Sequence, residues 1–256
     1  MLAVLVLVIA SVTPGVGADN LDTLSFDLEY GDTGVMVTEL NRQLNAAGFN
    51  ADDGDVFDYE TRHAVYAFQK HHELETDGVF TAAMWELLAQ PITMPQQKNA
   101  NRIEVDIGKQ VLYVLRNHEV VYIAPISSGN GELYTSSRGT RAYAVTPEGE
   151  YRIERNINGT RRSFLGTLYD PYYFVGGFAF HGSGSVPNYP ASHGCVRLTM
   201  WDSAKLKDYF FIGQPVYIYG GRTPVLEEYT PPPSAAELEE ATSQWPRARL
   251  LIPQGL

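Results

Sequence analysis

The sequence predicts a protein of two parts, a small bundle of three short helices followed by a mainly β domain. Two observations predict this division. Apolar residues recur at helical spacing between residues 34 and 88, whereas from residue 102 onward they alternate with a period of two. The 256-residue chain also carries 23 Gly and 15 Pro, which favour turns and strands over long helices. The fold class is therefore multidomain, and many short strands with few helices favour a β-sandwich or barrel-like second domain.

The helical part spans residues 26–90 and is predicted to contain three helices. The first helix ends at Gly48, and the second begins beside two candidate N-caps, Asp58 and Thr61. The third helix is expected over residues 81–88. The aromatic and aliphatic side chains of the three helices are best explained as a hydrophobic core. The expected core residues are Leu40, Leu44, Val65, Phe68, Trp85 and Leu88.

A linker and a β domain follow the helices. Residues 91–100 contain Pro and Gln without periodicity and predict a linker. Residues 101–220 form the predicted β domain, which also contains one helix at 201–209 with Thr199 as a candidate N-cap. Residues 221–256, rich in Pro and acidic side chains, predict a flexible or loosely docked tail. Strands are expected at residues 103–107, 111–115, 120–126, 141–145, 149–153, 172–180 and 216–219.

Residues 1–18 predict an export signal. An apolar run is followed by small residues that end in a candidate cleavage site, Val16-Gly17-Ala18. No Lys or Arg precedes this run, so the basic n-region of a signal peptide is missing from the sequence. Pro14 and Gly15 leave the run short for a membrane span, and an uncleaved anchor is the alternative. We therefore expect an exported protein of the periplasm or cell wall, without stable membrane association once the signal is cleaved.

The net charge of −11 argues against a nucleic-acid partner, because a phosphate backbone binds basic surfaces. An acidic protein can still bind a polymer that carries its own amines and sugars.

Candidate chemistry gathers in one stretch of the β domain, residues 181–198. It holds Cys195, which is the only cysteine of the chain, two of the six histidines, and Arg197. In an exported protein a single cysteine has no disulfide partner within the chain, which favours a functional thiol over a buried inert one. Neighbouring imidazoles, cations and backbone N–H groups lower a thiol pKa and make a thiolate nucleophile. We therefore predict that Cys195 is a nucleophile.

Two histidines compete for the role of proton partner to Cys195. His193 lies two residues before the cysteine, so in an extended segment its side chain falls on the same side. His181 lies fourteen residues back at the end of an apolar strand, and a loop can fold it over the sulfur. Gly182 and Gly194 allow close backbone approach, so amides near Cys195 can point at a substrate oxygen.

The same stretch also contains the side chains of two other kinds of site. Two His and one Cys are possible zinc ligands, but a closed site needs a fourth ligand and no second ligand motif lies nearby. A serine nucleophile at Ser192 lacks the elbow motif that such residues need. Three roles are open for Arg197, namely lowering the thiol pKa, binding a substrate carboxylate, or pairing with Asp202.

The helical part resembles the peptidoglycan-binding domain of the three-helix type. The resemblance rests on Gly48-Phe49 after the first helix, on T-x-x-A-V-x-x-F-Q from Thr61, and on L-x-x-D-G-V-x-T from Leu74, which leads into W-x-x-L at Trp85. Phe80 departs from the family, which usually has Gly there, and this puts the shape of the loop in doubt. The resemblance implies a role in holding cell-wall glycan.

The second part resembles the L,D-transpeptidase catalytic domain over about residues 101–220. The motifs are H-G at His181 and S-H-G-C-V-R-L from Ser192, preceded by I-x-V-D-x-x-x-Q-x-L-Y-V from Ile103, T-P-x-G-x-Y from Thr146 and P-Y from Pro171. This ordered set is far more specific than a bare Cys and His pair. The segment between Gly182 and Ser192 departs from the family in being short and holding two prolines, which puts one pocket wall in doubt.

The resemblance implies the L,D-transpeptidase fold and a role for each matched residue. Cys195 matches the nucleophile and His181 its acid and base partner. Five residues match family positions that shape the site or help hold the oxyanion or substrate: Gly182, Ser192, His193, Gly194 and Arg197. Tyr172 matches an aromatic residue on the cavity wall.

The implied reaction joins two partners, both peptide stems of peptidoglycan. A stem tetrapeptide donates its acyl group to the cysteine and releases D-Ala, and an amine acceptor then takes the acyl group to form a cross-link. No metal or organic cofactor is implied. The alternatives are an L,D-carboxypeptidase, in which water is the acceptor, and a catalytically inactive wall-binding protein.

Overall fold

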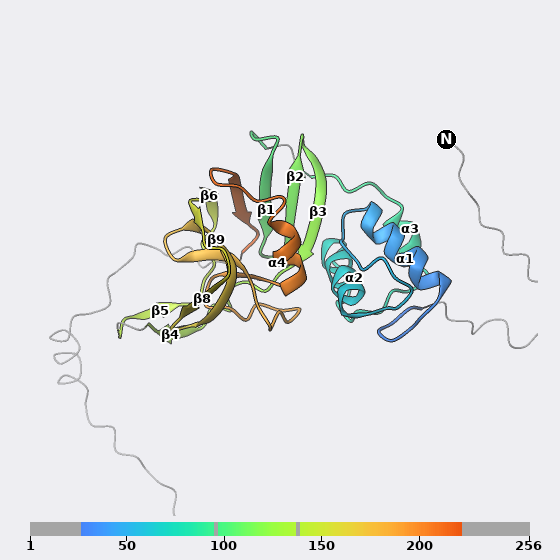
Figure 1. Ribbon diagram of the computed structural model, residues 1–256, viewed down its shortest axis with the longest axis horizontal. Helices are drawn as coiled ribbons and strands as arrows, with labels where there is room; N and C mark the ends of the chain where they lie inside the picture. The colour runs from blue at the N-terminus through green and yellow to red at the C-terminus, as the bar shows by residue number, and fades with distance from the viewer. Residues whose placement is uncertain (1–26, 95–96, 137–138, 222–256) are drawn as a thin grey trace, which may run out of the picture. The chain divides into compact units, whose positions relative to one another are not determined.

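The computed structural model describes residues 27–94, 97–136 and 139–221 (Figure 1). The predicted signal peptide at residues 1–18 lies outside these residues, as do two residues of the predicted linker and all of the predicted tail except Gly221. Among the described helices, none combines the length and apolar character that crossing a membrane requires.

The helical part, which we call the module, contains the three predicted helices, α1 (Val35–Ala46), α2 (Tyr59–His71) and α3 (Met84–Leu88). Asp58 is the N-cap of α2, since its carboxylate accepts the backbone N–H of Thr61 at 2.9 Å. The Thr61 hydroxyl instead donates to Asn41 in the module core. The third helix is shorter than the predicted 81–88, because Ala83 at its start offers no side chain to cap it.

Phe80, the departure from the family pattern, lies in the core of the module. Its side chain is fully buried, with its ring 5.5 Å from that of Phe68 and 5.0 Å from that of Trp85 between centroids. Its backbone exchanges two hydrogen bonds with Leu28, which pins the N-terminal segment to this loop. Of the expected core residues Trp85 is half-buried and the others are buried, so the large Phe80 ring completes a core that three short helices supply only in part.

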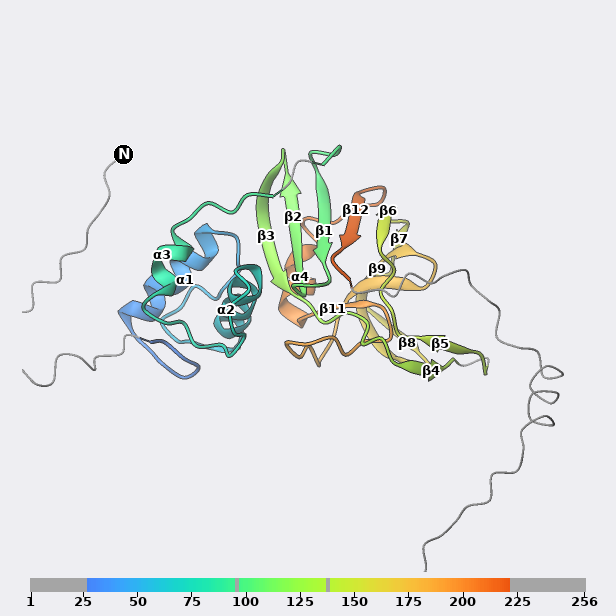
Figure 2. The same cartoon turned by 180° about the vertical axis from the view of Figure 1, so that it is seen from behind.

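The second part is mainly β, as predicted, and its strands form two larger sheets and a hairpin (Figures 1 and 2). The first sheet has the order β3 (Glu119–Pro125), β2 (Val111–Arg116), β1 (Arg102–Asp106), β12 (Pro215–Tyr219), β6 (Gly149–Arg152). The second has the order β11 (Val196–Leu198), β10 (Phe178–Gly182), β9 (Gly166–Val175), β7 (Arg155–Asn156), with β8 (Thr160–Ser163) also paired to β9. The hairpin joins β4 (Leu133–Thr135) to β5 (Arg141–Tyr143).

Side chains from both sheets and from α4 (Met200–Leu206) form one hydrophobic core. Leu112 and Val114 reach it from the first sheet, and Phe174 and Phe180 from the second. Thr199 caps α4 as predicted, because its hydroxyl accepts the backbone N–H of Asp202.

The prediction of one continuous strand at residues 172–180 is wrong. The chain turns at Gly176-Gly177 and returns, so that β9 and β10 form an antiparallel pair. The apolar residues on both sides of the turn hid it, although two adjacent glycines are a turn signal. Strand β8 was not predicted, because all four of its residues are exposed and none is apolar.

The other face of β2 packs on the helical module. Alternate residues of this strand, Val111, Tyr113 and Leu115, are buried in the module core together with Ile123 of β3. Polar contacts run beside them, since Gly48 accepts the N–H of Ile123 at 2.7 Å and the ring of His71 lies 2.9 Å from the Tyr113 hydroxyl. Both views show α2 beside β3 (Figures 1 and 2). The module and the first sheet therefore share one hydrophobic core.

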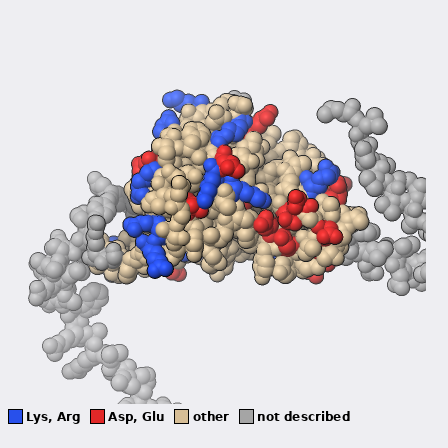
Figure 3. Space-filling view, in the orientation of Figure 1, with Lys and Arg blue, Asp and Glu red and all other residues tan. Residues whose placement is uncertain are grey.

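Charge is distributed unevenly between the two parts. On the face seen in Figure 3, acidic side chains gather over the module, whereas Lys and Arg are prominent over the β domain. An anionic ligand that approaches this face of the β domain therefore does not meet the strongly acidic surface that the net charge of −11 suggests.

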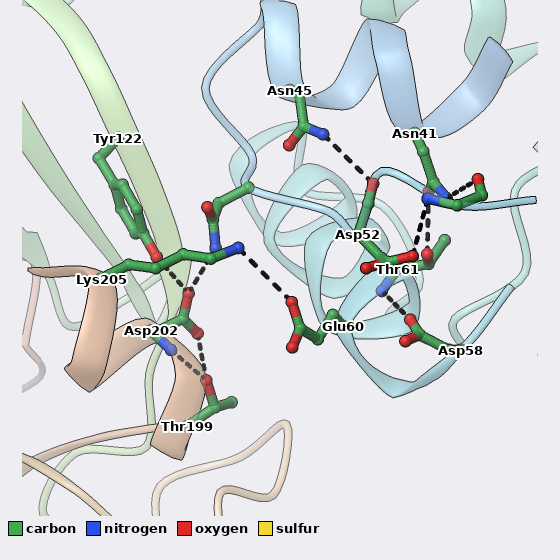
Figure 4. Close-up of polar contacts among 12 residues, drawn as sticks. Asn41, Asn45, Asp52, Asp58, Glu60, Thr61, Tyr122, Thr199, Asp202 and Lys205 are labelled. Carbon is green, nitrogen blue, oxygen red and sulfur yellow. Dashed lines mark hydrogen bonds and ion pairs between the residues drawn. The ribbon is translucent and has the colours of Figure 1, made fainter. Parts of the chain in front are cut away.

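A buried carboxylate joins α4 to the module (Figure 4). Asp202 accepts hydrogen bonds from the Thr199 hydroxyl at 2.6 Å, the Tyr122 hydroxyl at 2.8 Å and the Asn50 amide at 3.3 Å. Burial raises the pKa of Asp202 to about 6, although these hydrogen bonds act in the opposite direction. An ion pair between Lys205 and Glu60 at 3.5 Å lies nearby.

We expect Asp202 to make the free energy of unfolding fall as the pH rises from about 4 to about 6. In this window the folded state keeps a proton that the unfolded state releases, and the pKa difference corresponds to about 3 kcal/mol. The Asp202→Asn variant cannot release this proton, so its free energy of unfolding should lack this fall. Urea denaturation across this pH range measures it. Asp53→Asn, at an exposed carboxylate, is the control, and a fall of the same size in Asp202→Asn contradicts the assignment.

Candidate active site

The pairing of β10 with β11 brings the predicted catalytic residues to one face of the second sheet. Phe180 pairs with Val196, and both side chains are in the hydrophobic core. The next pair, His181 and Arg197, therefore faces the opposite side of the sheet, because side chains alternate along a strand. Cys195 directly precedes β11, two residues before Arg197, and so begins on the same face as His181.

The sulfur of Cys195 lies against the start of β10. The Sγ atom is 3.8 Å from the carbonyl oxygen of Gly177, and the thiol is half-buried. Burial raises the pKa of the Cys195 thiol, while the backbone N–H of Ala179 and the charge of Arg197 act to lower it. The thiol therefore stays protonated at neutral pH.

His181, the predicted proton partner, is buried and neutral. Its side chain is 6% exposed, and Nδ1 lies 2.9 Å from the carbonyl oxygen of Gly182. A carbonyl only accepts, so Nδ1 carries the proton and the lone pair is on Nε2. Burial lowers the pKa of His181, and the positive charge of Arg197 lowers it further. The imidazole is thus neutral at pH 7 and has one nitrogen free to take a proton.

Hydrogen bonds fix the loop that carries the cysteine. The Ser192 hydroxyl accepts the N–H of Gly194 at 2.9 Å and donates to the carbonyl of Cys195 at 2.5 Å. The Thr146 hydroxyl donates to the carbonyl of Gly194 at 2.9 Å. Gly194 has a φ of +123°, and a Cβ atom there would collide with the Phe178 ring, so only glycine fits.

The backbone N–H groups of this loop differ in their hydrogen bonding. Among the described residues, the N–H groups of His193 and Cys195 have no hydrogen-bond partner, whereas the N–H of Gly194 donates to Ser192. The Gly194 amide, which was expected to help hold the oxyanion, is therefore occupied within the protein.

Other predicted site residues lie farther from the sulfur or have other neighbours. The His193 ring packs edge-on against Tyr134 of β4, with 4.9 Å between centroids. Tyr172 is buried in the hydrophobic core with its ring against Phe210, a placement that gives no support to a role on the cavity wall. Gly182 packs against α4, where an added Cβ would lie 3.0 Å from the Cβ of Ser203.

The three roles that were open for Arg197 are narrowed by its neighbours. The Asp202 carboxylate bonds to Thr199, Tyr122 and Asn50, and among the described residues Arg197 forms no ion pair. Its guanidinium lowers the pKa values of the Cys195 thiol and the His181 imidazole, and binding of a substrate carboxylate stays a prediction.

The sequence did not predict the segment that borders the cysteine loop on its other side. Ser127 exchanges two backbone hydrogen bonds with Arg197, at 3.1 and 3.0 Å, and Ser128 accepts the N–H of Ser192. Gly129 donates to the Thr146 hydroxyl, which links this segment to the T-P-x-G-x-Y motif. The run of small residues after β3 was the signal available in the sequence, because small side chains permit such close backbone approach.

Across the described residues, no group of three or more His, Cys, Asp and Glu side chains is placed to share a metal ion. Two surface cavities, of 490 and 570 Å³, lie where the module meets the β domain, and neither is lined by Cys195 or His181.

Comparison with known proteins agrees with this architecture. The sequence model of the L,D-transpeptidase catalytic domain matches residues 100–218, and that of a peptidoglycan-binding domain matches residues 33–88. An L,D-transpeptidase structure from Xylanimonas cellulosilytica is 36% identical, covers 75% of this chain and 97% of its own, and superposes with a TM-score of 0.70. One from Stackebrandtia nassauensis is 22% identical, with 77% and 96% covered and a TM-score of 0.44. No curated protein matches the chain.

The chain therefore belongs to the L,D-transpeptidase family and carries an N-terminal peptidoglycan-binding domain. The mainly β domain preceded by a three-helix module, expected from the sequence, is confirmed.

Proposed function

We propose that this protein is a cysteine L,D-transpeptidase that cross-links peptide stems of peptidoglycan. The observation that carries the proposal is the neutral His181, which pairs across β10 and β11 with Arg197, two residues from Cys195. A protonated thiol and a neutral imidazole form a nucleophile and base pair without a metal or cofactor.

The first half of the reaction acylates the enzyme. His181 Nε2 takes the thiol proton as Sγ of Cys195 attacks the carbonyl carbon of the amide that joins diaminopimelate to the terminal D-Ala. The N–H groups of Cys195 and His193 stabilise the negative oxygen that develops. The C–N bond then breaks, the imidazolium gives its proton to the departing amine, and a thioester remains.

The second half transfers the acyl group. An amine of another stem attacks the thioester carbon while His181 takes a proton from it. The C–S bond breaks, the new amide forms, and the proton returns to the sulfur. In a carboxypeptidase, water replaces the amine and the product is a free tripeptide stem.

Both domain families act on or bind the cell wall, so the proposed site of action is outside the cytoplasm. Free access of an amine acceptor decides between cross-linking and hydrolysis. The alternative of an inactive wall-binding protein is disfavoured by the strand pairing that brings His181 opposite Arg197, two residues from the Cys195 thiol.

We expect purified enzyme and disaccharide-tetrapeptide muropeptides to yield cross-linked dimers with release of D-Ala. Mass spectrometry of the products measures both. Tripeptides without dimers would identify the carboxypeptidase instead. A product mixture identical to an enzyme-free control would contradict both activities.

A further inference from the structure

A groove lies along the seam between the module and the β domain, and we call it the seam groove. Its volume is 570 Å³, and three segments line it, residues 70–76 at the end of α2 and beyond, the β1–β2 turn at 106–110, and residues 188–190. The last segment belongs to the short loop between His181 and the cysteine motif, which departs from the family pattern.

Lys70 is a buried cation in this groove without a counter-ion. Its side chain is 6% exposed, and its ammonium donates to the carbonyl of Ile126 at 3.3 Å. Among the described residues Lys70 forms no ion pair. The Glu73 carboxylate, which also lines the groove, pairs with the Lys109 ammonium at 2.9 Å. Asp106, the other carboxylate that lines the groove, accepts the backbone N–H of Lys109. Burial lowers the pKa of Lys70 to about 7. A buried charge is costly unless an anion neutralises it, so Lys70 favours a ligand with a negative group.

The groove also offers an exposed aromatic ring on a loop that is tied to the module. The side chain of Tyr189 is 61% exposed at the groove, while its backbone carbonyl accepts the Ser127 hydroxyl at 2.8 Å. The Asn188 amide donates to the carbonyl of Thr76 at 2.8 Å and ties the loop to the module. A ring fixed at its backbone and open on its face suits packing against a sugar or an aliphatic side chain.

The groove is continuous with the candidate active site through the backbone. Ser127, which holds Tyr189, is hydrogen-bonded to Arg197, two residues from the nucleophile. Gln110 of the groove donates to the Ser128 hydroxyl at 2.6 Å, and Ser128 accepts the N–H of Ser192. A ligand in the groove therefore lies beside the segment that supports the cysteine loop.

We propose that the seam groove is a second binding site for peptidoglycan, in which Lys70 pairs with a carboxylate of a peptide stem and Tyr189 packs against the same muropeptide. This inference rests on the proposed function for the identity of the polymer. Neither Cys195 nor His181 lines this site, and residues of both domains do.

The test distinguishes the seam groove from the candidate active site by blocking Cys195. Cys195 is acylated with a carbapenem, complete modification is verified by mass spectrometry, and a disaccharide-tetrapeptide is titrated into the acyl-enzyme by calorimetry. We expect binding to persist, and Lys70→Met to weaken it about 10- to 100-fold, as for loss of a charged hydrogen bond. Tyr189→Ala should weaken it as well, and Lys70→Arg should retain it. Phe211→Ala, which removes an exposed ring outside the groove, should leave it unchanged.

Conversion of the stem carboxylates to amides tests the charge directly. The amidated muropeptide should bind the parent and Lys70→Met equally weakly. Equal binding of the native muropeptide by these two proteins overturns the proposal, as does loss of all binding on acylation. Binding of peptide-free glycan strands as tightly as the muropeptide also overturns it, since glycan then supplies the contact. Thermal unfolding checks that each variant is folded.

Failure of the proposed function gives a different result. If the carbapenem does not acylate Cys195, the nucleophile assignment fails, and the same comparison of parent with Lys70→Met is made on the unmodified chain.

Discussion

Replacement of Cys195 by alanine is expected to abolish acyl-enzyme formation and turnover. The thiol is the atom that forms the covalent bond, and no second cysteine exists in the chain to replace it. Incubation with a carbapenem followed by mass spectrometry of the intact protein should show the added mass on the parent and none on Cys195→Ala. Muropeptide assays should show no dimers.

The fold should survive this change. The hydrogen bond from the Cys195 thiol goes to the Gly177 carbonyl at 3.8 Å, and such a weak contact contributes little to stability. Binding to purified cell walls should therefore match that of the parent, which separates lost chemistry from lost structure. Turnover that survives in Cys195→Ala would refute the nucleophile assignment.

Replacement of His181 by alanine should slow acylation about 10²- to 10⁴-fold, the range for loss of a general base. The reason is that burial keeps the Cys195 thiol protonated, so its attack depends on the Nε2 lone pair. His193→Ala is the matched control. Its backbone N–H remains in place and its ring contacts Tyr134, so we expect a much smaller effect. Stopped-flow acylation rates measure both.

The pH profile provides a second readout for His181. Its pKa lies below the ordinary value of 6.5, so the base stays neutral and active as the pH falls through 6.5. The acylation rate of the parent should decline only at lower pH, and His181→Ala should lack this decline. A larger loss in His193→Ala than in His181→Ala would reverse the two roles.

Much of the candidate site was predictable because its parts are local in the sequence. The motif from Ser192 to Leu198 places the thiol directly before a strand, and the apolar residues beside His181 indicate a second strand. Only the pairing of these strands was missing. That pairing explains why His181, fourteen residues away, joins the site while His193, two residues away, packs elsewhere.

The remaining features depend on contacts between distant segments. The sequence around Ser127 does not predict that Ser127 pairs with Arg197. The sequence around Lys70 does not predict that Lys70 lies near the loop beside the candidate active site. The burial of β2 on both faces could be predicted from the sequence. An uninterrupted apolar run at residues 111–115 indicates a strand covered on both sides, whereas an alternating one indicates a strand with one face in solvent.

The shared core between the module and the first sheet limits how far the catalytic domain can move from the module. A module on a flexible tether would let the catalytic domain sample every bond within the length of its linker. Here Val111, Tyr113 and Leu115 are buried among the module helices, so the linker at residues 91–100 does not set that distance. The shared core instead fixes the spacing between the module and the first sheet, whatever the length of the linker.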